Sequence, residues 1–356
     1  MTVNPLDPPM LTAALPGVGG RIKQFPEDFE VEEIPSYEPS GTGEHLYVWL
    51  EKRDVGPEYL TRTVAQRVGV PVGMIGVAGL KDRRAVTRQW VSLPQEAEPR
   101  LARIDGDGIR ILAVHRHGNK LKTGHLRGNR FRVLIRNADT SRAATLNAIL
   151  TRLRAEGLPN YYGPQRFGRD QSTLQLGWRC LAGTASRRIR PFLFKFALSA
   201  VQSFLFNAYL GQRLADGLWR RVLPGDVLMK WPSGGLFVCD DPAVDQPRFE
   251  AREVVIGGPM FGSRTFAAKA VAAEREAAIL AAYQVEPATF ARFGKLVTGT
   301  RRHVQVYLDD LMAEWEPEGL RLTFTLPSGS YATVLLREIM KTQPEDEEDA
   351  ASEEAD

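Results

Sequence analysis

Along the first third of the chain, apolar residues alternate with polar or aromatic ones. The segment 45–50 reads His-Leu-Tyr-Val-Trp-Leu, and the segment 30–34 reads Glu-Val-Glu-Glu-Ile. A period of two is typical of β-strands with one buried face. We therefore predict strands at both segments, and also at 109–114, at 131–135 and, near the C-terminus, at 320–326.

Other segments carry the spacing of helices. One helix is predicted over 57–68, which starts with the proline that a first helical turn tolerates. A second is predicted over 140–156, with Thr140 as its N-cap and a glycine after its last residue. The middle of the chain is mostly helical, with an amphipathic run from Pro191 and an alanine-rich run over 264–283, although a small hairpin is expected over 226–239.

The composition is that of an ordinary globular protein. The chain has 356 residues, of which 43% are hydrophobic and 25% charged, so it has enough material for two cores. No apolar run approaches the roughly 20 residues of a membrane helix, so no membrane partner is expected. Residues 1–20 make a poor signal peptide and a plausible flexible lead-in, and we expect a cytoplasmic protein. Cys180 and Cys239 are expected to be buried thiols.

The net charge of +3 conceals an asymmetry. Every charged residue in the tail 344–356 is acidic, so the rest of the chain is more basic than the total suggests. We expect the tail to be disordered, and the basic body is the pattern of a polyanion binder. Residues 115–136 hold seven Lys or Arg and no acid, which favours contact with RNA or DNA. The pair His115 and His117 has no further ligand at metal spacing, so no metal is expected.

One carboxylate lies among cations at the end of a predicted strand. The apolar run 75–80 is followed by Lys-Asp-Arg-Arg at 81–84 and then by a second strand-like run at 89–93. Neighbouring cations favour the ionised form of Asp82, which could then act as nucleophile, base or electrostatic stabiliser. In an isolated segment of this kind, a turn capped by the aspartate and flanked by solvated arginines is the more common structure.

The surrounding residues favour the chemical interpretation. Residues 79–90 read Gly-Leu-Lys-Asp-Arg-Arg-Ala-Val-Thr-Arg-Gln-Trp, which closely resembles the signature around the catalytic aspartate of the TruD family of tRNA pseudouridine synthases. Four more segments resemble motifs of the same family in the same order: 23–29, 124–131, 158–168 and 326–338. The resemblance covers roughly residues 23–341, and the motifs are specific in combination.

This resemblance implies roles for individual residues. Asp82 would be the catalytic residue. Residues that would contact the target uridine or adjoin Asp82 are Lys23, Phe29, Asn129, Phe131, Tyr331 and Arg337. Residues that would contact RNA are Lys81, Arg83, Arg130, Gln165 and Arg166. Core packing remains an alternative for the two phenylalanines, and a structural turn remains one for Gln165 and Arg166.

The resemblance also implies a fold. It predicts an α+β protein whose catalytic domain, with a mixed and mainly antiparallel sheet, is split between residues 1–159 and 299–343. A largely helical TRUD domain would be inserted at 160–298, and 344–356 would be the acidic tail. The order of the predicted elements, strands first, helices in the middle and a strand and helix at the end, agrees with this class.

The implied activity is that of an isomerase that converts uridine to pseudouridine at position 13 of tRNA. The mechanism would depend on an aspartate and need no cofactor, which fits a sequence with no dinucleotide fingerprint, Walker loop or zinc set. The partner would be tRNA, and we expect a monomer. Two alternatives remain open: a non-catalytic RNA-binding or RNA-folding protein, and a hydrolase that releases free uracil.

Overall fold

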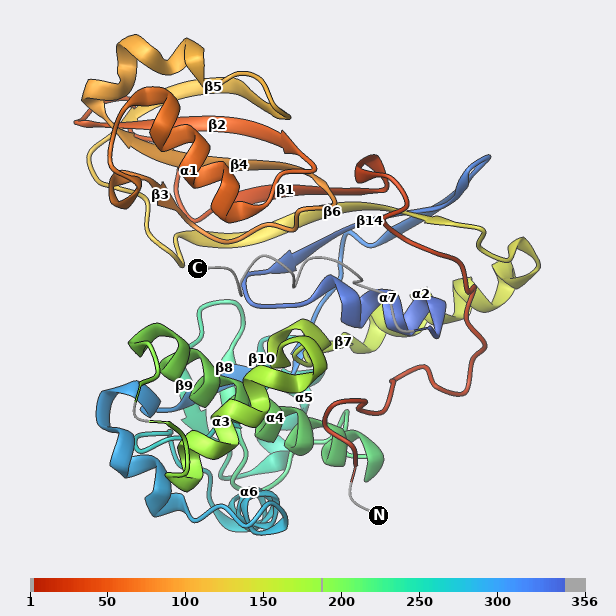
Figure 1. Cartoon of the computed structure of the whole chain (residues 1–356). Coiled ribbons are helices and arrows are strands. Elements are labelled where there is room, and N and C mark those ends of the chain that lie inside the picture. Colours follow the sequence, from red (N-terminus) through yellow and green to blue (C-terminus); the bar gives the residue numbers. More distant parts are fainter. Residues whose placement is uncertain (1–2, 187, 343–356) are drawn as a thin grey trace. The chain divides into compact units, whose positions relative to one another are not determined.

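The computed structural model describes residues 3–186 and 188–342, so the acidic tail and Arg187 lie outside the described residues. The chain forms two compact units (Figure 1). The sheet unit comprises Pro16–Leu150, Leu308–Ala332 and the chain from Ile339, and the middle unit comprises the chain up to Leu15, Thr151–Tyr307 and Thr333–Glu338. The domain boundaries predicted from the sequence, at 159 and 299, differ in detail from these edges and stay a prediction.

An eight-stranded sheet forms the frame of the sheet unit. Its strands are β1 (Phe29–Pro35), β2 (His45–Arg53), β3 (Gly76–Val77), β4 (Val86–Pro94), β5 (Ile109–His117), β6 (Leu126–Arg136), β13 (Met312–Glu316) and β14 (Gly319–Pro327). They are ordered β13-β14-β6-β1-β4-β2-β5, with β3 beside β4. Only β1 and β4 pair in parallel, so the predicted mixed and mainly antiparallel sheet is confirmed.

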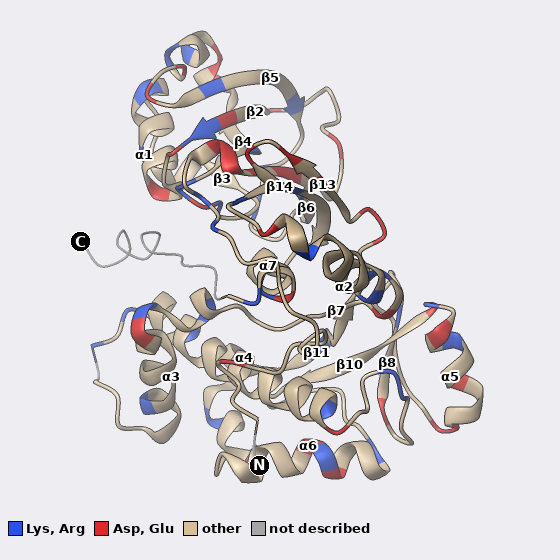
Figure 2. Cartoon of the chain, turned by 90° about the vertical axis from the view of Figure 1, so that its right-hand side faces the viewer, with Lys and Arg blue, Asp and Glu red and all other residues tan. Residues whose placement is uncertain are grey.

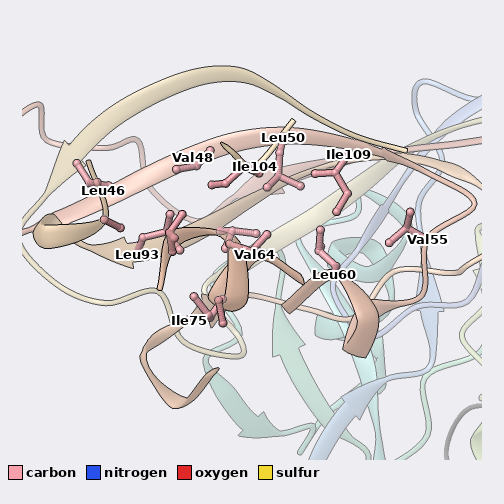
Figure 3. Packing of buried hydrophobic residues seen from close by; sticks show 14 residues of the cluster. Leu46, Val48, Leu50, Val55, Leu60, Val64, Ile75, Leu93, Ile104 and Ile109 are labelled. Carbon is pink, nitrogen blue, oxygen red and sulfur yellow. The ribbon is translucent and has the colours of Figure 1, made fainter. Parts of the chain in front are cut away.

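Helix α1 (Pro57–Val68) covers one face of this sheet, and its bounds agree with the prediction. The leucines and valine of β2, at 46, 48 and 50, pack against Leu60 and Val64 of the helix (Figure 3). Tyr47 on the opposite face of β2 is also buried, because Trp90 and Leu121 cover it. The predicted half-buried strand is therefore covered on both faces over part of its length.

The second predicted helix starts differently from the prediction. Residues Thr140–Arg142 form a 3-10 turn that leads into α2 (Ala143–Glu156). The cap is Asp139, whose Oδ1 accepts hydrogen bonds from Ser141 N at 3.0 Å and Ser141 Oγ at 2.6 Å. Thr140 is thus the first residue of the turn and not its N-cap. The sequence Asp-Thr-Ser offers three capping side chains in a row, and hydrophobic spacing does not choose among them.

The assignment of Asp139 rather than Thr140 as the cap can be tested. We expect Asp139→Ala to lower the midpoint of thermal unfolding by a few degrees, because two donors of Ser141 lose their acceptor. Thr140→Ala should leave the midpoint almost unchanged. Differential scanning calorimetry of both variants distinguishes the two caps, and a larger drop for Thr140→Ala would reverse the assignment.

The middle unit combines helices with small sheets. Its helices are α3 (Ser172–Ala182), α4 (Pro191–Ala215), α5 (Pro242–Glu250) and α6 (Ala270–Ala282), and α7 (Ala332–Met340) contributes residues 333–338. Its strands are β7 (Leu158–Pro159), β8 (Val227–Lys230), β9 (Leu236–Val238), β10 (Val254–Met260), β11 (Thr300–His303) and β12 (Gln305–Val306). The predicted hairpin is β8 and β9, and it joins a four-stranded sheet ordered β11-β10-β8-β9. The expectation of a largely helical middle therefore missed a sheet.

Within the part of the chain that the structure describes, α4 is long and apolar enough to cross a membrane by length and composition. This corrects the expectation that no apolar run approaches that length. In its most apolar stretch, 72% of the residues are buried inside the structure. The continuous apolar character of α4 is thus the pattern of a helix that is surrounded by its own protein.

The N-terminal segment is pinned at several points, contrary to the expected flexible lead-in. The buried carboxylate of Glu338 accepts hydrogen bonds from Leu11 N at 2.6 Å and Thr12 N at 2.9 Å. Asn207 of α4 donates to Pro5 O at 3.1 Å. Leu11 and Thr12 are themselves buried. Hydrogen bonds to a partner more than three hundred residues away leave no local pattern, so the proline-rich composition alone was misleading.

Candidate active site

A buried polar group interrupts the apolar face of the sheet that α1 covers. In the register of β2 and β4, Leu50 lies opposite Gln89, and Lys52 lies opposite Thr87. On the neighbouring strands, Glu33 lies opposite Asn129. Lys52, Thr87, Gln89 and Glu33 are all buried. Burying polar groups costs free energy unless they are paired, so the hydrogen-bond partners of these side chains show which part of the chain they fix in place.

Lys52 holds the loop that joins β3 to β4. Its side chain is fully buried. The ammonium donates to Val55 O at 2.6 Å, to Lys81 O at 3.2 Å and to Asp82 O at 2.6 Å. A lysine has three donors and no acceptor, so these carbonyls match its capacity. Lys52 thereby fixes the backbone of Asp82 from the buried side of the loop. The loop begins earlier than predicted, because the strand expected over 75–80 ends at Val77.

Lys81 is held in the same buried region. Its ammonium pairs with Glu33 Oε2 at 2.9 Å, and both side chains are nearly inaccessible to solvent. Burial raises the pKa of the Glu33 carboxyl, and the charge of Lys81 opposes that shift. The predicted contact of Lys81 with RNA does not fit this structure, because its charged group is buried against Glu33.

The Asp82 carboxylate is accessible and has an oriented partner. It lies 2.9 Å from Lys23 Nζ, and the Asp82 side chain is 45% exposed whereas that of Lys23 is 8% exposed. Lys23 has a left-handed backbone with φ of 55°, a conformation that side chains other than glycine adopt at a cost. Arg83 approaches Asp54 at 3.7 Å. The cation that orients Asp82 thus comes from the motif at 23–29, as the resemblance implied.

Aromatic rings lie beside this pair. Lys23 Nζ is 4.7 Å from the centroid of the Phe29 ring, and Phe29 meets Phe131 edge to face at 6.0 Å. Phe131 in turn stacks on Phe324 at 5.1 Å. Both Phe29 and Phe131 are buried, so they pack as core residues in this structure while they border the Lys23 side chain. The structure thus shows the core packing that the sequence left open, and contact of these two rings with the target uridine stays a prediction.

Asn129 shares the sheet face of Phe131, two residues away on β6. Its side-chain oxygen is buried and has no hydrogen-bond partner among the described residues. Leu326, opposite Asn129 on β14, precedes the turn that leads to Tyr331. Tyr331 is partly buried and comes directly before α7. Glu33 Oε1 and Thr87 Oγ1 are also buried without a partner among the described residues. A buried acceptor without a partner costs free energy, and a ligand that supplied a donor would remove that cost.

The opposite face of the sheet carries paired charges. Arg130 lies 4.0 Å from Glu32, and Arg132 lies 3.6 Å from Glu30. Figure 2 shows both acidic and basic residues on the strands of this sheet. Arg130 therefore projects away from Asn129 and Phe131 and has a carboxylate neighbour. The basic run predicted over 115–136 is partly neutralised by β1, which weakens the inference of RNA contact for Arg130.

The other predicted site residues belong to the middle unit. Gln165 is exposed and accepts a hydrogen bond from Thr333 at 3.5 Å. Arg166 donates to Ser203 at 3.1 Å and lies along α4. Arg337 donates to Pro8 O at 2.8 Å and pairs with Asp7. Arg337 was a candidate partner of Asp82, and its carboxylate partner in the structure is Asp7 instead.

Sequence reasoning missed two positioning residues. One is Lys52. The other is Asp28, which is buried, accepts a hydrogen bond from Phe25 N at 3.0 Å, and pairs with Arg136 at 2.8 Å. Asp28 thus fixes the turn that precedes Phe29. It stands inside the motif Pro-Glu-Asp-Phe, which could have drawn attention to it.

Known proteins match this chain over nearly its whole length. The family model described as tRNA pseudouridine synthase D (TruD) matches residues 6–189 and 182–339. A protein from Anaeromyxobacter sp. (strain Fw109-5), named tRNA pseudouridine synthase D, is 45% identical over 351 residues, which cover 96% of this chain and 99% of the relative. A protein of the same name from Thermus thermophilus is 44% identical, with 98% and 97% covered.

A solved structure has the same fold. It is a Methanosarcina mazei protein assigned as tRNA pseudouridine synthase D, with a TM-score of 0.78 at 24% identity, and the match covers 95% of this chain and 97% of the other. Together, the mainly antiparallel sheet and the matching family model and relatives define an α+β protein of the pseudouridine synthase class. The chain belongs to the TruD family of tRNA pseudouridine synthases.

Proposed function

We propose that this protein isomerises uridine to pseudouridine in tRNA, at position 13, with Asp82 as the catalytic residue. The observation that carries the proposal is the Asp82 carboxylate itself. It is accessible, its backbone is anchored by the buried Lys52, and Lys23 orients its side chain. Lys23 and Asp82 lie in two of the segments that resemble family motifs, and Lys52 lies outside these segments but binds the backbone of the Asp82 loop.

The target nucleotide must leave its stack before it reacts. A uridine within folded RNA cannot present its glycosidic carbon to a carboxylate, and enzymes that act on bases flip them into a pocket. Phe29, Phe131 and Tyr331 are the aromatic residues proposed to line that pocket. Asn129 would accept a hydrogen bond from the uracil N–H, which would satisfy its buried oxygen.

The reaction rearranges bonds without adding atoms. The bond between ribose C1′ and uracil N1 breaks, the uracil turns, and C5 bonds to C1′ while it loses a proton and N1 gains one. Asp82 would serve as the nucleophile at C1′ or as the base toward a ribose proton. No electron or phosphoryl group is transferred, so the proposed mechanism is cofactor-free.

The experiment for this proposal measures both possible products. The purified protein is incubated with tRNA that carries labelled uridine, and the RNA is digested and analysed for pseudouridine, uridine and free uracil. We expect pseudouridine at constant RNA mass. Free uracil would support the hydrolase alternative, and unchanged uridine at full RNA binding would support the non-catalytic one. That the protein acts as a monomer in the cytoplasm stays a prediction.

Affinity for tRNA should depend on salt, because phosphate contacts release counterions. Arg127 is exposed on β6, two residues before Asn129. We expect Arg127→Gln to reduce the slope of log affinity against log salt by about 0.7, as for one lost phosphate contact. Arg110 is the matched control, because it pairs with Glu51 at 3.0 Å on the opposite sheet face.

The measurement is a set of binding titrations of tRNA at several salt concentrations. Arg110→Gln should keep the wild-type slope. An unchanged slope for Arg127→Gln, or an equal loss for both variants, would contradict a specific phosphate contact at Arg127.

A further inference from the structure

Helix α4 begins with an aromatic strip, in which Phe192 is exposed and Phe196 is partly buried. Phe192, Phe196, Ser199 and Ser203 follow one another at intervals of four, three and four residues, so they lie on one face of the helix. The Phe192 and Phe196 rings are nearly parallel, with an interplanar angle of 9° and centroids 6.0 Å apart. Phe192 is 79% exposed. An aromatic side chain in that position contributes little to the core of its own protein.

A guanidinium group lies along the same strip. Arg166 Nε donates to Ser203 Oγ at 3.1 Å, and the guanidinium also donates to Ser199 Oγ. The guanidinium carbon is 4.7 Å from the centroid of the Phe196 ring. Two hydroxyl groups and the rings of Phe196 and Tyr162, the latter with its centroid 5.8 Å from the guanidinium carbon, therefore fix the position of Arg166. Phe192, Phe196 and the Arg166 guanidinium lie next to one another along α4, and we call this group of residues the α4 platform.

Basic residues predominate in the sequence around the start of α4, although the exposed Asp170 lies close to Arg166 in the chain. From Gln171 to Ala215 the sequence contains no Asp or Glu. Arg188, Arg190 and Lys195 are exposed in this stretch, close in sequence to Phe192. Flat aromatic faces beside cations are the composition of surfaces that bind unpaired nucleotides, where bases stack on rings and phosphates contact Lys or Arg. A protein partner would need many acidic groups to match the same surface.

We propose that the α4 platform stacks an unpaired base of the tRNA substrate on Phe192 and Phe196, with Arg188, Arg190 and Lys195 against the adjoining phosphates. That the bound RNA is tRNA rests on the proposed function. The proposal adds a binding surface that belongs to the middle unit, whereas Asp82 belongs to the sheet unit. The platform contributes affinity and takes no part in the chemical step.

The test is a series of substitutions at Phe192, which is too exposed to support folding. We expect Phe192→Ala to weaken equilibrium binding of tRNA about tenfold, the usual loss for one stacked base. Phe192→Tyr keeps a flat ring and should bind like the wild type. Phe192→Leu keeps apolar area without a ring and should bind like Phe192→Ala. The single-turnover rate at saturating tRNA should be unchanged in all three.

Val244 provides the matched control. It is an exposed apolar residue of α5, beside acidic rather than basic neighbours at 240, 241 and 245. Val244→Ala should therefore leave the affinity for tRNA unchanged. Wild-type affinity for Phe192→Ala, or for Phe192→Leu, would overturn the stacking proposal. So would a concentration-dependent self-association of the wild type that Phe192→Ala abolishes, because that result would assign the strip to a second copy of the chain.

The proposal can fail independently of the proposed function. If the wild type forms pseudouridine but the Phe192 series binds tRNA uniformly, the α4 platform is wrong and the enzyme assignment stands. If the wild type forms no pseudouridine and the Phe192 series still changes RNA affinity in the predicted order, the platform stands as an RNA-binding surface and the enzyme assignment fails.

Discussion

Replacement of Asp82 by asparagine is expected to reduce pseudouridine formation by about a thousandfold or more, because an amide is neither a nucleophile nor a base. Asparagine has nearly the same size, so the loop held by Lys52 should keep its conformation. Affinity for tRNA should therefore stay within about twofold of the wild type, since the loss concerns the chemical step. Single-turnover kinetics with saturating enzyme, together with a separate binding titration, measure the two effects.

Asp54→Asn is a suitable control for this variant. Asp54 is another exposed carboxylate next to the same loop, where it approaches Arg83 at 3.7 Å. Its backbone is left-handed, with φ of 53°, which asparagine tolerates well. We expect nearly wild-type turnover for Asp54→Asn. Wild-type turnover for Asp82→Asn would remove Asp82 from the mechanism.

Replacement of Lys52 by methionine is expected to slow turnover about a hundredfold, because a displacement of about 1 Å in a reacting group has that effect. Methionine reproduces the unbranched apolar stem of lysine but lacks the ammonium and donates no hydrogen bond. The carbonyls of Val55, Lys81 and Asp82 would lose the ammonium that holds them, at about 1–3 kcal/mol for each group left unpaired. The loop backbone would then no longer fix the position of the Asp82 carboxylate.

The role of Lys52 in positioning is separated from simple stability by two readouts. We expect a lower melting temperature for Lys52→Met, but at temperatures where the variant is folded, turnover should fall while the dissociation constant for tRNA changes little. Lys122→Met, at an exposed lysine, should change neither the melting temperature nor the turnover at saturating tRNA. A folded Lys52→Met variant with wild-type turnover would show that Lys52 only stabilises the fold.

Part of this site could be predicted from the order of residues alone. Alternation over 45–50 placed Leu46, Val48 and Leu50 on the covered face of β2, and the structure confirms it. The same parity continues to Lys52, so a signal for a buried lysine was present. A charge at the end of a strand is more often solvated, and nothing local shows that three carbonyls from two segments surround this one.

Other features depend on strand register, which sequence patterns leave open. The run of basic residues over 115–136 contains no acid, but Arg130 and Arg132 lie beside Glu32 and Glu30 because β6 pairs with β1. The acids come from about a hundred residues earlier in the chain. Likewise, Lys81 could be assigned to RNA contact only while its buried partner Glu33 was unknown.

The most direct test of the account is nucleotide-resolution mapping of pseudouridine in tRNA after incubation with the wild-type protein and with Asp82→Asn in parallel. We predict one new pseudouridine, at position 13, with the wild type and none with the variant. Pseudouridine at position 13 with both proteins would contradict the role of Asp82, and its absence with the wild type would contradict the proposed activity.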